Sequence, residues 1–549
     1  MSSTVYNSVD RIWRGPDFPT WLFNEKANLG RIIVSVLNRN PKKVAQISDN
    51  NGIRMTNKEM VSDMVKIAGG LKIRGCTKGD VIGFVARNSH NLAPTIFACF
   101  LLEAIPQGMD ITQEEGEIYH MFQMTDPKFV FCDDDKVNVV QRVLQKLQSS
   151  AIIILFGSKQ GSYLHIEDLM KEGDINIIKK KVYEDSCKDS EIKYHILCSS
   201  SGTTGPPKGV CIRYPSLVDY DWDLRNSISS SSDCLFSFSP IFWTVGYVVL
   251  FRSLFQGITR IITTDTFNPE LYLHIVRKYK VTHTLISPLY ISNVLKSPRF
   301  TPTSLSSLKN MWCVGSLVTE DLAKKVYQCV PRGVLEVVYG MSEIGLIAKY
   351  LYDPKIPMSV GHLAPSVEAI IIDEDGNKLI QGETGELCLR AQYQLLGYFK
   401  NPKATKDLID VDDFVHTGDV GFFDEDGFLR IVGRRKDLIK YYMFHVSCGE
   451  IEKIIATHPG VAQVSVVGIP DPQCYQLPAA VVVKKPTSSL NEDEVIDLIA
   501  SRLPDPYKLR GGVYFVDKLP MTFSAKLKKV EVEKMAEEMY LRKINLSSY

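Results

Sequence analysis

The first half of the chain alternates short apolar runs with segments in which apolar residues recur at helical spacing. Residues 44–48 form a strand-like run that ends at the turn signal Asp49-Asn-Asn-Gly52. Thr56-Asn-Lys-Glu59 has the pattern of a capping box at the start of an amphipathic helix. A second strand is predicted over residues 81–86, and a buried helix over residues 91–103. Alternation of this kind favours a parallel sheet that is covered by helices.

The pattern changes near Gly433, where the chain becomes rich in turns and charges. Beyond this point the sequence predicts a small set of α and β elements: helices over 449–457 and after an Asn491 cap, and strands over 461–467, 479–483 and 513–516. We therefore expect two domains, residues 1–433 and residues 434–549, joined by a charged hinge.

Composition places the chain among globular proteins and excludes several classes. It has 549 residues, of which 45% are hydrophobic and 23% are charged, and a formal charge of +1 at pH 7. This balance argues against a general nucleic-acid binder. No apolar stretch reaches the roughly 18 residues that a membrane-spanning helix needs. The twelve cysteines include no CxxC pair, which is typical of free thiols in a reducing compartment.

The most informative string is Cys198-Ser-Ser-Ser-Gly-Thr-Thr-Gly-Pro-Pro-Lys-Gly-Val210, which lies between two apolar runs. Glycines let backbone N–H groups approach anionic oxygens closely, and the hydroxyls and the lysine add further donors. The candidate phosphate-binding residues are Ser199, Ser200, Ser201, Gly202, Thr203, Thr204, Gly205 and Lys208. A Walker A loop is excluded, because Pro206-Pro207 disfavours a helix and Gly209 follows the lysine.

This string resembles the phosphate loop of the adenylate-forming superfamily, which comprises acyl-CoA synthetases, 4-coumarate–CoA ligases, firefly luciferase and peptide-synthetase adenylation domains. Further motifs follow in the family's order. Val338-Tyr-Gly-Met-Ser-Glu343 is similar to the family's Tyr-Gly-x-Thr-Glu. The resemblance implies that Tyr339 and Gly340 adjoin adenine, that Ser342 touches the α-phosphate and that Glu343 helps to hold Mg²⁺, for which a carboxylate is a suitable ligand.

His416-Thr-Gly-Asp-Val-Gly421 resembles the family's Thr-Gly-Asp motif and follows Gly385-Glu-Leu387 and Gly397-Tyr398 at the family's spacing. By this resemblance Asp419 accepts hydrogen bonds from the ribose hydroxyls, a role that suits the two oxygens of a carboxylate.

Two motifs in the C-terminal part complete the resemblance. Gly433-Arg-Arg-Lys-Asp-Leu-Ile-Lys440 is similar to the family's hinge, so Arg434 would reach the ribose and Asp437 would be the pivot. Leu519-Pro-Met-Thr-Phe-Ser-Ala-Lys526 is similar to Pro-x-Thr-x-x-Gly-Lys. Lys526 then takes the place of the catalytic lysine that bridges carboxylate and α-phosphate oxygens, and it acts together with Lys208, Ser342 and Glu343.

The sequence also departs from the family pattern. Trp243 stands where many members carry a histidine of the acyl pocket, and it either shortens that pocket or packs in the core. Met443 replaces a glycine near the pantetheine path, Cys448 replaces a proline, and Tyr442 takes the place of a lysine that luciferase uses in its oxidative step. The pocket candidates are Trp243, Ser287, Gly315 and Ser316, which imply an apolar acid.

The resemblance implies an α/β fold with a large N-terminal domain of α/β layers plus a distorted β-barrel, and a small mobile C-terminal α+β domain. It implies a ligase that converts an apolar fatty or aromatic carboxylic acid to an acyl-CoA through acyl-AMP, with ATP, Mg²⁺ and CoA and without nucleic acid. A luciferase-like oxygenase and a non-catalytic binding homologue remain as alternatives. We expect a cytoplasmic location; some family members are peroxisomal, but the C-terminus is not Ser-Lys-Leu.

Overall fold

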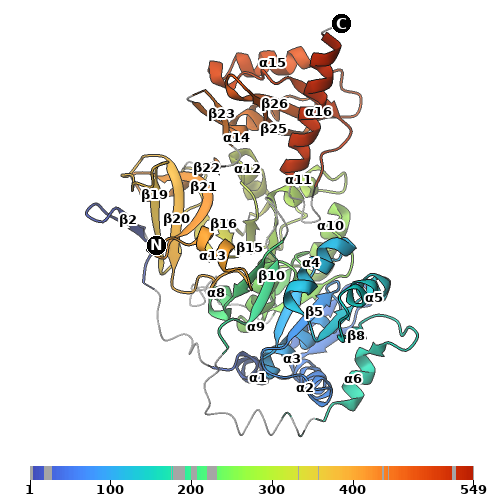
Figure 1. Cartoon of the computed structure of the whole chain (residues 1–549). Helices are drawn as coiled ribbons and strands as arrows, with labels where there is room; N and C mark the ends of the chain where they lie inside the picture. Colours follow the sequence, from blue (N-terminus) through green and yellow to red (C-terminus); the bar gives the residue numbers. More distant parts are fainter. Residues whose placement is uncertain are drawn as a thin grey trace.

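The computed structural model of the protein describes residues 4–17, 27–174, 176, 178, 192–199, 207–218, 232–331, 333–356, 358–435, 438–442, 444–521 and 527–547. This part of the chain contains four sheets and the helices that flank them (Figure 1). Two large sheets are mainly parallel, a third is antiparallel, and a small fourth sheet is built from the C-terminal residues.

The first sheet has seven strands in the order β11-β10-β6-β5-β7-β8-β9. Its strands are β5 (Val81–Val85), β6 (Ile105–Gly108), β7 (Phe129–Cys132), β8 (Ile152–Leu155), β9 (Leu164–His165), β10 (Ile196–Ser199) and β11 (Gly209–Ile212). Its helices are α1 (Leu29–Asn38), α2 (Asn57–Ile73), α3 (Leu92–Leu102), α4 (Glu115–Thr125), α5 (Val137–Lys146) and α6 (Ile166–Glu172). The strand expected over 81–86 and the buried helix expected over 91–103 are thereby confirmed as β5 and α3.

The capping box predicted from Thr56 and Glu59 is also present. The Thr56 hydroxyl accepts a hydrogen bond from the Glu59 backbone N–H, and the Glu59 carboxylate accepts one from the Thr56 backbone N–H. This reciprocal pair satisfies two backbone donors at the start of α2. Every residue of α3 is buried, because α3 packs against α1, α2 and β6.

The second sheet has nine strands in the order β18-β17-β16-β15-β14-β12-β13-β3-β4. They are β3 (Val44–Ser48), β4 (Arg54–Thr56), β12 (Cys234–Phe236), β13 (Thr259–Ile262), β14 (His283–Ile286), β15 (Asn310–Val314), β16 (Val334–Met341), β17 (Gly345–Leu351) and β18 (His362–Leu363). The helices of this region are α8 (Tyr214–Val218), α9 (Thr244–Phe255), α10 (Pro269–Tyr279), α11 (Pro288–Lys296) and α12 (Glu320–Cys329). Strands β3, β13, β12, β14, β15 and β16 are parallel, so their carboxyl ends lie at one edge.

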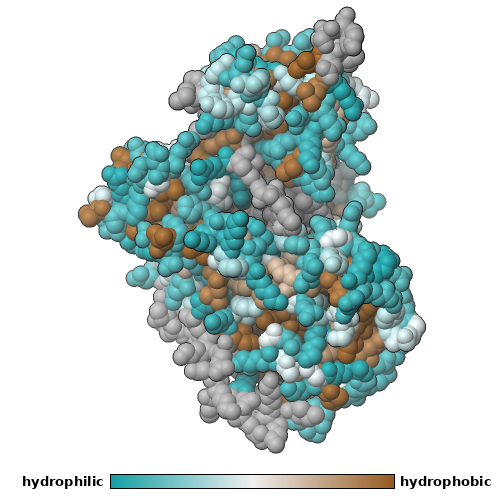
Figure 2. Space-filling model, viewed as in Figure 1, coloured by the Kyte–Doolittle hydropathy of each residue, from teal (hydrophilic) through white to brown (hydrophobic). Residues whose placement is uncertain are grey.

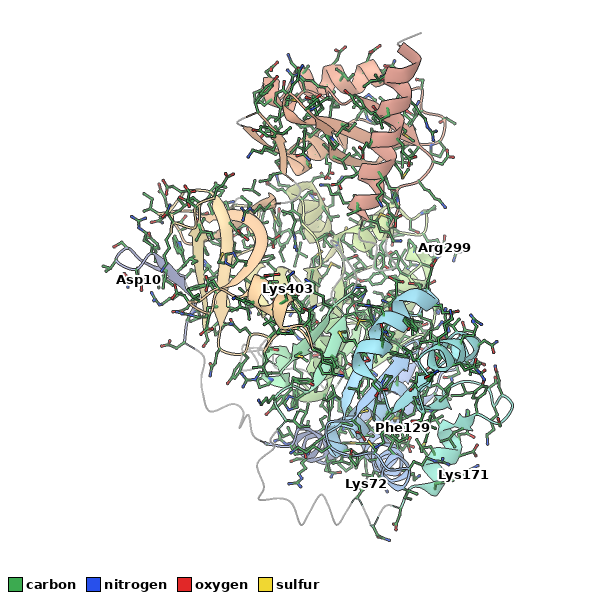
Figure 3. The ribbon with its side chains drawn as sticks, viewed as in Figure 1. Asp10, Lys72, Phe129, Lys171, Arg299 and Lys403 are labelled. Carbon is green, nitrogen blue, oxygen red and sulfur yellow. The ribbon has the colours of Figure 1, made fainter. Side chains whose placement is uncertain are left out.

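The third sheet is antiparallel and has the order β1-β2-β19-β20-β21-β22 in the described residues. Its strands are β1 (Val5–Asn7), β2 (Ile12–Arg14), β19 (Val367–Ile372), β20 (Gly385–Ala391), β21 (Val415–Phe423) and β22 (Leu429–Arg434), and α13 (Pro402–Leu408) lies between β20 and β21 in the chain. The sequence led us to expect a distorted β-barrel in the large domain, and among the described residues this region forms an antiparallel sheet in which no barrel closure is detected. Lys403 marks α13 in Figure 3.

Strands of the fourth sheet come after residue 437 in the chain. They are β23 (Leu438–Tyr441), β24 (Phe444–Ser447), β25 (Val461–Asp471), β26 (Tyr475–Lys484) and β27 (Val513–Val516), and the helices are α14 (Cys448–Ile455), α15 (Glu492–Ala500) and α16 (Lys529–Ser547). Strands β25 and β26 are longer than the apolar runs predicted, because the two strands pair with each other as far as Asp471 and Tyr475. Cross-strand backbone hydrogen bonds thus extend the strands past the buried residues.

Separate apolar clusters support these layers. Phe129 of β7 is fully buried in the cluster around the first sheet (Figure 3), whereas the C-terminal sheet and its helices form clusters of their own. Hydrophilic residues cover most of the visible face in Figure 2. Among the helices in the described ranges, none combines the length and the apolar character that a bilayer crossing requires.

Candidate functional site

The carboxyl ends of three neighbouring parallel strands bring several candidate residues to one edge of the second sheet. Ser287 directly follows β14, Gly315 and Ser316 directly follow β15, and the motif from Tyr339 onward ends β16. In open α/β sheets, ligands bind at this edge. In the sequence these candidates belong to separate segments. The parallel pairing of β14, β15 and β16 brings them to the same edge of the sheet.

The pocket candidates at this edge differ in what they contact. Ser287 caps α11, because its hydroxyl accepts a hydrogen bond from the Tyr290 backbone N–H at 3.3 Å. Gly315 and Ser316 are exposed, and Gly315 has a φ of 103°, which favours glycine. At Gly315 the backbone leaves the strand in a conformation that a residue with a side chain would rarely adopt. The Ser287 side chain, in contrast, is already used to cap α11.

The predicted phosphate loop joins the antiparallel strands β10 and β11. Ser199 and Gly209 are paired in this hairpin, so the two ends of the loop are held together. Ser199 is fully buried, and within the described ranges no group forms a hydrogen bond with its hydroxyl. The remaining loop candidates lie outside the described residues: Ser200, Ser201, Gly202, Thr203, Thr204 and Gly205.

Tyr398 connects this hairpin to the acidic residue of the second motif. Its ring lies 4.8 Å below the Lys208 ammonium, and its hydroxyl donates a hydrogen bond of 2.9 Å to Glu343 Oε1. Tyr398 also forms a β-bridge with Val210. Burial and the Glu343 carboxylate raise the pKa of Tyr398 far above its usual value, so the phenol stays protonated and donates.

Sequence reasoning did not assign Tyr398 to the site. The Gly397-Tyr398 pair was noted only for its spacing before the Thr-Gly-Asp motif. The position of a half-buried tyrosine hydroxyl next to a lysine and a carboxylate is a property of the folded chain, and the Gly397-Tyr398 pair gave no local signal of it.

Ser342 and Trp243 are brought together at the start of α9. Thr244 donates a hydrogen bond of 2.8 Å to the Ser342 hydroxyl, and Trp243 precedes Thr244 as the N-cap residue of α9. Trp243 is half-buried and contacts the Phe242 ring edge-on, with 4.5 Å between ring centroids. The preceding residue, Phe242, packs closely against Gly108. A side chain at Gly108 would not fit, because its Cβ would lie only 2.9 Å from the Phe242 Cα. Trp243 thus lies beside the motif that contains Ser342, on a closely packed segment.

Two residues from two other motifs contact the Asp419 carboxylate. The Tyr339 hydroxyl donates a hydrogen bond to Asp419 Oδ2, and Arg434 Nε lies 2.6 Å from Asp419 Oδ1. Asp419 in β21 faces Arg434 in β22, and it is 5% exposed. Burial and the Asp419 charge raise the pKa of Tyr339 well above its usual value, so Tyr339 remains a donor.

A bulge explains how Tyr339 reaches this carboxylate. The pairing of β16 with β17 shifts in register between Tyr339 and Gly340. Such a bulge changes the direction of the side chains next to it. The sequence predicted Tyr339 and Asp419 as ligands of adenine and ribose, and the contact between them was not foreseen.

Three candidates of the C-terminal part, Asp437, Met443 and Lys526, lie outside the described residues. Lys528, two positions after Lys526, forms an ion pair of 3.0 Å with Glu531, which raises the pKa of the lysine, and the Glu117 and Glu114 carboxylates at the start of α4 raise it further. The described residues just after Lys526 therefore lie near the large N-terminal part.

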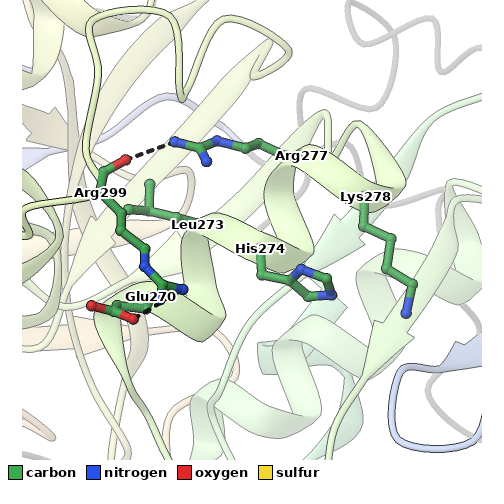
Figure 4. Close-up of a pocket in the computed structure, with 6 residues that line it drawn as sticks. All are labelled: Glu270, Leu273, His274, Arg277, Lys278 and Arg299. Carbon is green, nitrogen blue, oxygen red and sulfur yellow. Dashed lines mark hydrogen bonds and ion pairs between the residues drawn. The ribbon is translucent and has the colours of Figure 1, made fainter.

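A separate cavity of about 380 Å³ lies beside α10 (Figure 4). It is lined by Glu270, Leu273, His274, Arg277, Lys278 and Arg299. Arg299 forms an ion pair of 3.1 Å with Glu270, and Arg277 donates a hydrogen bond to the Arg299 backbone oxygen. None of the candidate residues lines this cavity, so it is distinct from the site described above.

Comparisons with known proteins agree with this architecture. The family model described as AMP-binding enzyme matches residues 34–399, and the AMP-binding enzyme C-terminal domain matches residues 450–526. The probable 4-coumarate–CoA ligase 3 of Dictyostelium discoideum is 28% identical over 93% of this chain and 95% of its own. The luciferin 4-monooxygenase of Photinus pyralis is 30% identical over 86% of this chain and 88% of its own.

Among solved structures, ATP-bound MatB from Rhodopseudomonas palustris superposes with a TM-score of 0.83 at 23% identity, over 93% of this chain and 99% of that one. This likeness confirms the expected α/β fold with a large N-terminal and a small C-terminal domain.

Proposed function

Because the chain belongs to the adenylate-forming family of AMP-binding enzymes, we propose that it is an ATP-dependent acid–CoA ligase for an apolar carboxylic acid. The observation that carries the proposal is the convergence of two groups of residues, Lys208 with Tyr398 and Glu343, and Asp419 with Tyr339 and Arg434. The first group suits a polyphosphate with its cation, and the second suits a nucleoside.

The proposed reaction has two steps. A carboxylate oxygen of the acid attacks the α-phosphorus of ATP, the bond to the β-phosphate oxygen breaks, and pyrophosphate leaves acyl-AMP behind. The sulfur of CoA then attacks the acyl carbon, and AMP leaves with the bonding electron pair while the thiol proton passes to solvent. The first step asks mainly for positioning and charge stabilisation from the protein.

The residues present fit Mg²⁺ as well as the nucleotide. Glu343 and Ser342 are adjacent and offer a carboxylate and a hydroxyl, which are the hard oxygen donors that this ion prefers. When bound, Mg²⁺ supplies positive charge to the phosphate oxygens. Tyr398 holds the Glu343 carboxylate through one oxygen, so this side chain is oriented before any ligand enters.

Our assignments in the C-terminal domain follow from the motifs. Lys526 would act as the catalytic lysine of the first step, and Asp437 would be the hinge about which the small domain turns between the two steps. Residues 1–433 and 434–549 would be the two moving parts. The nearness of Lys528 to Glu114 and Glu117 supports a position of this region against the large domain.

The acid is the least specified substrate. Ser287, Gly315 and Ser316 follow strands at the edge of the sheet, and Trp243 precedes α9. None of these four residues is charged, which favours a fatty or aromatic acid. A luciferase-like oxygenase is the second candidate because of the 30% identity to a luciferin 4-monooxygenase. Tyr442 argues against it, since luciferase carries a lysine at this place in the motif.

A pyrophosphate-release screen tests the proposal. The purified chain is mixed with ATP, Mg²⁺ and a panel of straight-chain fatty acids and hydroxycinnamic acids, with and without CoA, and pyrophosphate, AMP and acyl-CoA are measured. The ligase requires acyl-CoA to form with at least one acid. Light emission or oxygen uptake would instead support the oxygenase. ATP binding without pyrophosphate release for every acid would leave only the non-catalytic homologue.

A further inference from the structure

A second cluster of side chains with ligand chemistry lies in the antiparallel sheet. Glu386 and Cys388 belong to β20, and His416 belongs to the adjacent strand β21, where it is paired with Cys388. One potential ligand atom from each of these residues lies within 4.8 Å of the others. The nucleotide motif uses Asp419 on the same strand, but the proposed reaction uses none of these three side chains.

The two distances from the His416 ring to the other members of the cluster match those around a tetrahedral metal ion. His416 Nδ1 is 3.5 Å from Cys388 Sγ and 3.6 Å from Glu386 Oε1. Zinc binds sulfur at about 2.3 Å and nitrogen or oxygen at about 2.0–2.2 Å, so tetrahedral ligands lie roughly 3.4–3.6 Å apart. Two of the three ligand–ligand distances thus have this spacing already, and the third, between Cys388 and Glu386, is at most 4.8 Å.

Neighbouring residues orient two of the three ligands. Arg435 Nη1 lies 2.6 Å from Glu386 Oε2, so the other carboxylate oxygen, Oε1, faces His416. Asp410 Oδ2 lies 3.8 Å from Nε2 of His416, on the far side of the ring from Cys388. A carboxylate at this nitrogen favours the tautomer with the proton on Nε2, and it leaves the lone pair of Nδ1 directed at the cluster.

Irregular strand pairing brings the ligands to one place. The register between β20 and β21 shifts between Glu386 and Cys388, so Cys388 pairs with His416 while Glu386 pairs with Val420. The intervening residues of β21 include Gly418, which has a φ of 68°. A bulge of this kind redirects side chains beside it. It directs Asp419 to Tyr339 and leaves His416 among Glu386 and Cys388.

We propose that Glu386, Cys388 and His416 form a binding site for a divalent transition metal of the zinc class. The thiol releases its proton to solvent when the metal–sulfur bond forms, and the thiolate, the carboxylate and the neutral imidazole then bind the ion. Cys388 and Glu386 are largely buried, whereas one third of the His416 side chain is exposed. A metal ion enters past His416, and water completes its coordination.

Cobalt substitution tests the site on the full-length protein. The protein is freed of metal with a chelator, dialysed against Co²⁺ and examined by absorption spectroscopy and by metal analysis. We expect intense visible bands of a tetrahedral ion together with a thiolate-to-cobalt band in the near ultraviolet. Zn²⁺ should abolish these bands by displacing cobalt and should raise the melting temperature, since it binds the folded state.

Variants assign the signal to these residues. Cys388→Ser and His416→Gln should each lose one equivalent of Co²⁺ and the thiolate band, whereas Cys132→Ser, at an equally buried strand cysteine, should keep both. Asp410→Asn should weaken the affinity about 10- to 100-fold, the usual effect of losing a partner of a metal-bound histidine. His416→Gln changes a partly exposed residue and so tests the site even if Cys388→Ser does not fold. Equal cobalt binding by wild type and His416→Gln, or a spectrum without the thiolate band, would overturn the proposal.

Discussion

Asp419 is held on both carboxylate oxygens, one by the Tyr339 hydroxyl and the other by the Arg434 guanidinium. A nucleotide bound at this carboxylate would meet an acceptor whose position is already set by neighbouring side chains. Pre-ordered groups lose less conformational entropy when a ligand binds. At the scale of single residues, the position of Asp419 therefore depends on side chains from two other motifs, those of Tyr339 and Arg434.

Asp419→Ala should weaken ATP binding by about 1.5–3 kcal/mol, the range for hydrogen bonds that involve a charged group. AMP should lose the same amount, because both nucleotides carry the ribose. Calorimetric titration of both ligands measures this. Glu425→Ala, at an exposed turn next to the same strand, is the control and should leave both affinities unchanged. Unchanged binding of ATP and AMP to Asp419→Ala would remove this residue from the site.

Tyr398→Phe should slow acyl-AMP formation about 10- to 100-fold, because Glu343 loses the hydrogen bond that orients it. The Mg²⁺ concentration needed for half-maximal activity should also rise, since Glu343 would hold the ion less firmly. Tyr279→Phe also removes a tyrosine hydroxyl that is bonded to a carboxylate, that of Asp49, and it serves as the control. If both variants show the same kinetics as wild type, Tyr398 only packs between the strands.

At the scale of elements, the Asn491 helix cap in the C-terminal domain was predicted from local sequence and is present. Asn491 Oδ1 accepts a hydrogen bond of 2.9 Å from the Glu494 backbone N–H at the start of α15. Such a contact depends on residues three positions apart, so it is visible in the sequence.

Asn491→Ala should destabilise the C-terminal domain by about 1 kcal/mol, within the usual range of about 0.5–2 kcal/mol for an N-cap. Urea denaturation followed by a probe in this domain measures the change. Asn491→Ser, which keeps a capping oxygen, should recover most of the loss. If the alanine and serine variants were equally destabilised, the effect would not come from the cap.

At the scale of the whole molecule, the proposed chemistry depends on residues that two domains contribute. Lys526→Ala should lower acyl-AMP formation by about 10²–10³, the cost of removing one preorganised charge from the transition state. ATP affinity should stay within a few-fold, because the contacts of Asp419, Tyr339 and Lys208 belong to the large domain. Lys528→Ala is the matched control, and it should retain most of the activity. Near-normal pyrophosphate formation by Lys526→Ala would show that Lys526 is not the catalytic lysine.

The second half-reaction is tested through Met443. If this side chain occupies the pantetheine path, overpacking slows thioester formation alone. Met443→Gly should then raise the rate of acyl-CoA formation from preformed acyl-AMP in single-turnover experiments, without changing acyl-AMP formation. Glycine costs up to about 1 kcal/mol in backbone freedom, so the melting temperature is measured alongside. A fast wild-type step that the change does not improve would mean that Met443 swings aside.

Most of the helices, strands and motifs that could be predicted from the sequence depend on residues close together in the chain. The strand at Val44–Ser48, the capping box at Thr56 and the strand at Val513–Val516 are present as expected, because each depends on neighbouring residues. The string around Lys208 was recognisable for the same reason. Strand ends were less predictable, since β25 and β26 extend as far as their mutual pairing allows.

Contacts between distant segments were decided by the tertiary structure alone. Tyr398 meets Glu343 across 55 positions of the chain, and Tyr339 meets Asp419 across 80. The same holds for the cluster of Glu386, Cys388 and His416, which depends on a register shift between two strands. Residue types and spacings determine which short elements form and which ligands a loop can bind. Which side chains share a site depends on strand order, register and bulges, because these set the direction of each side chain in space.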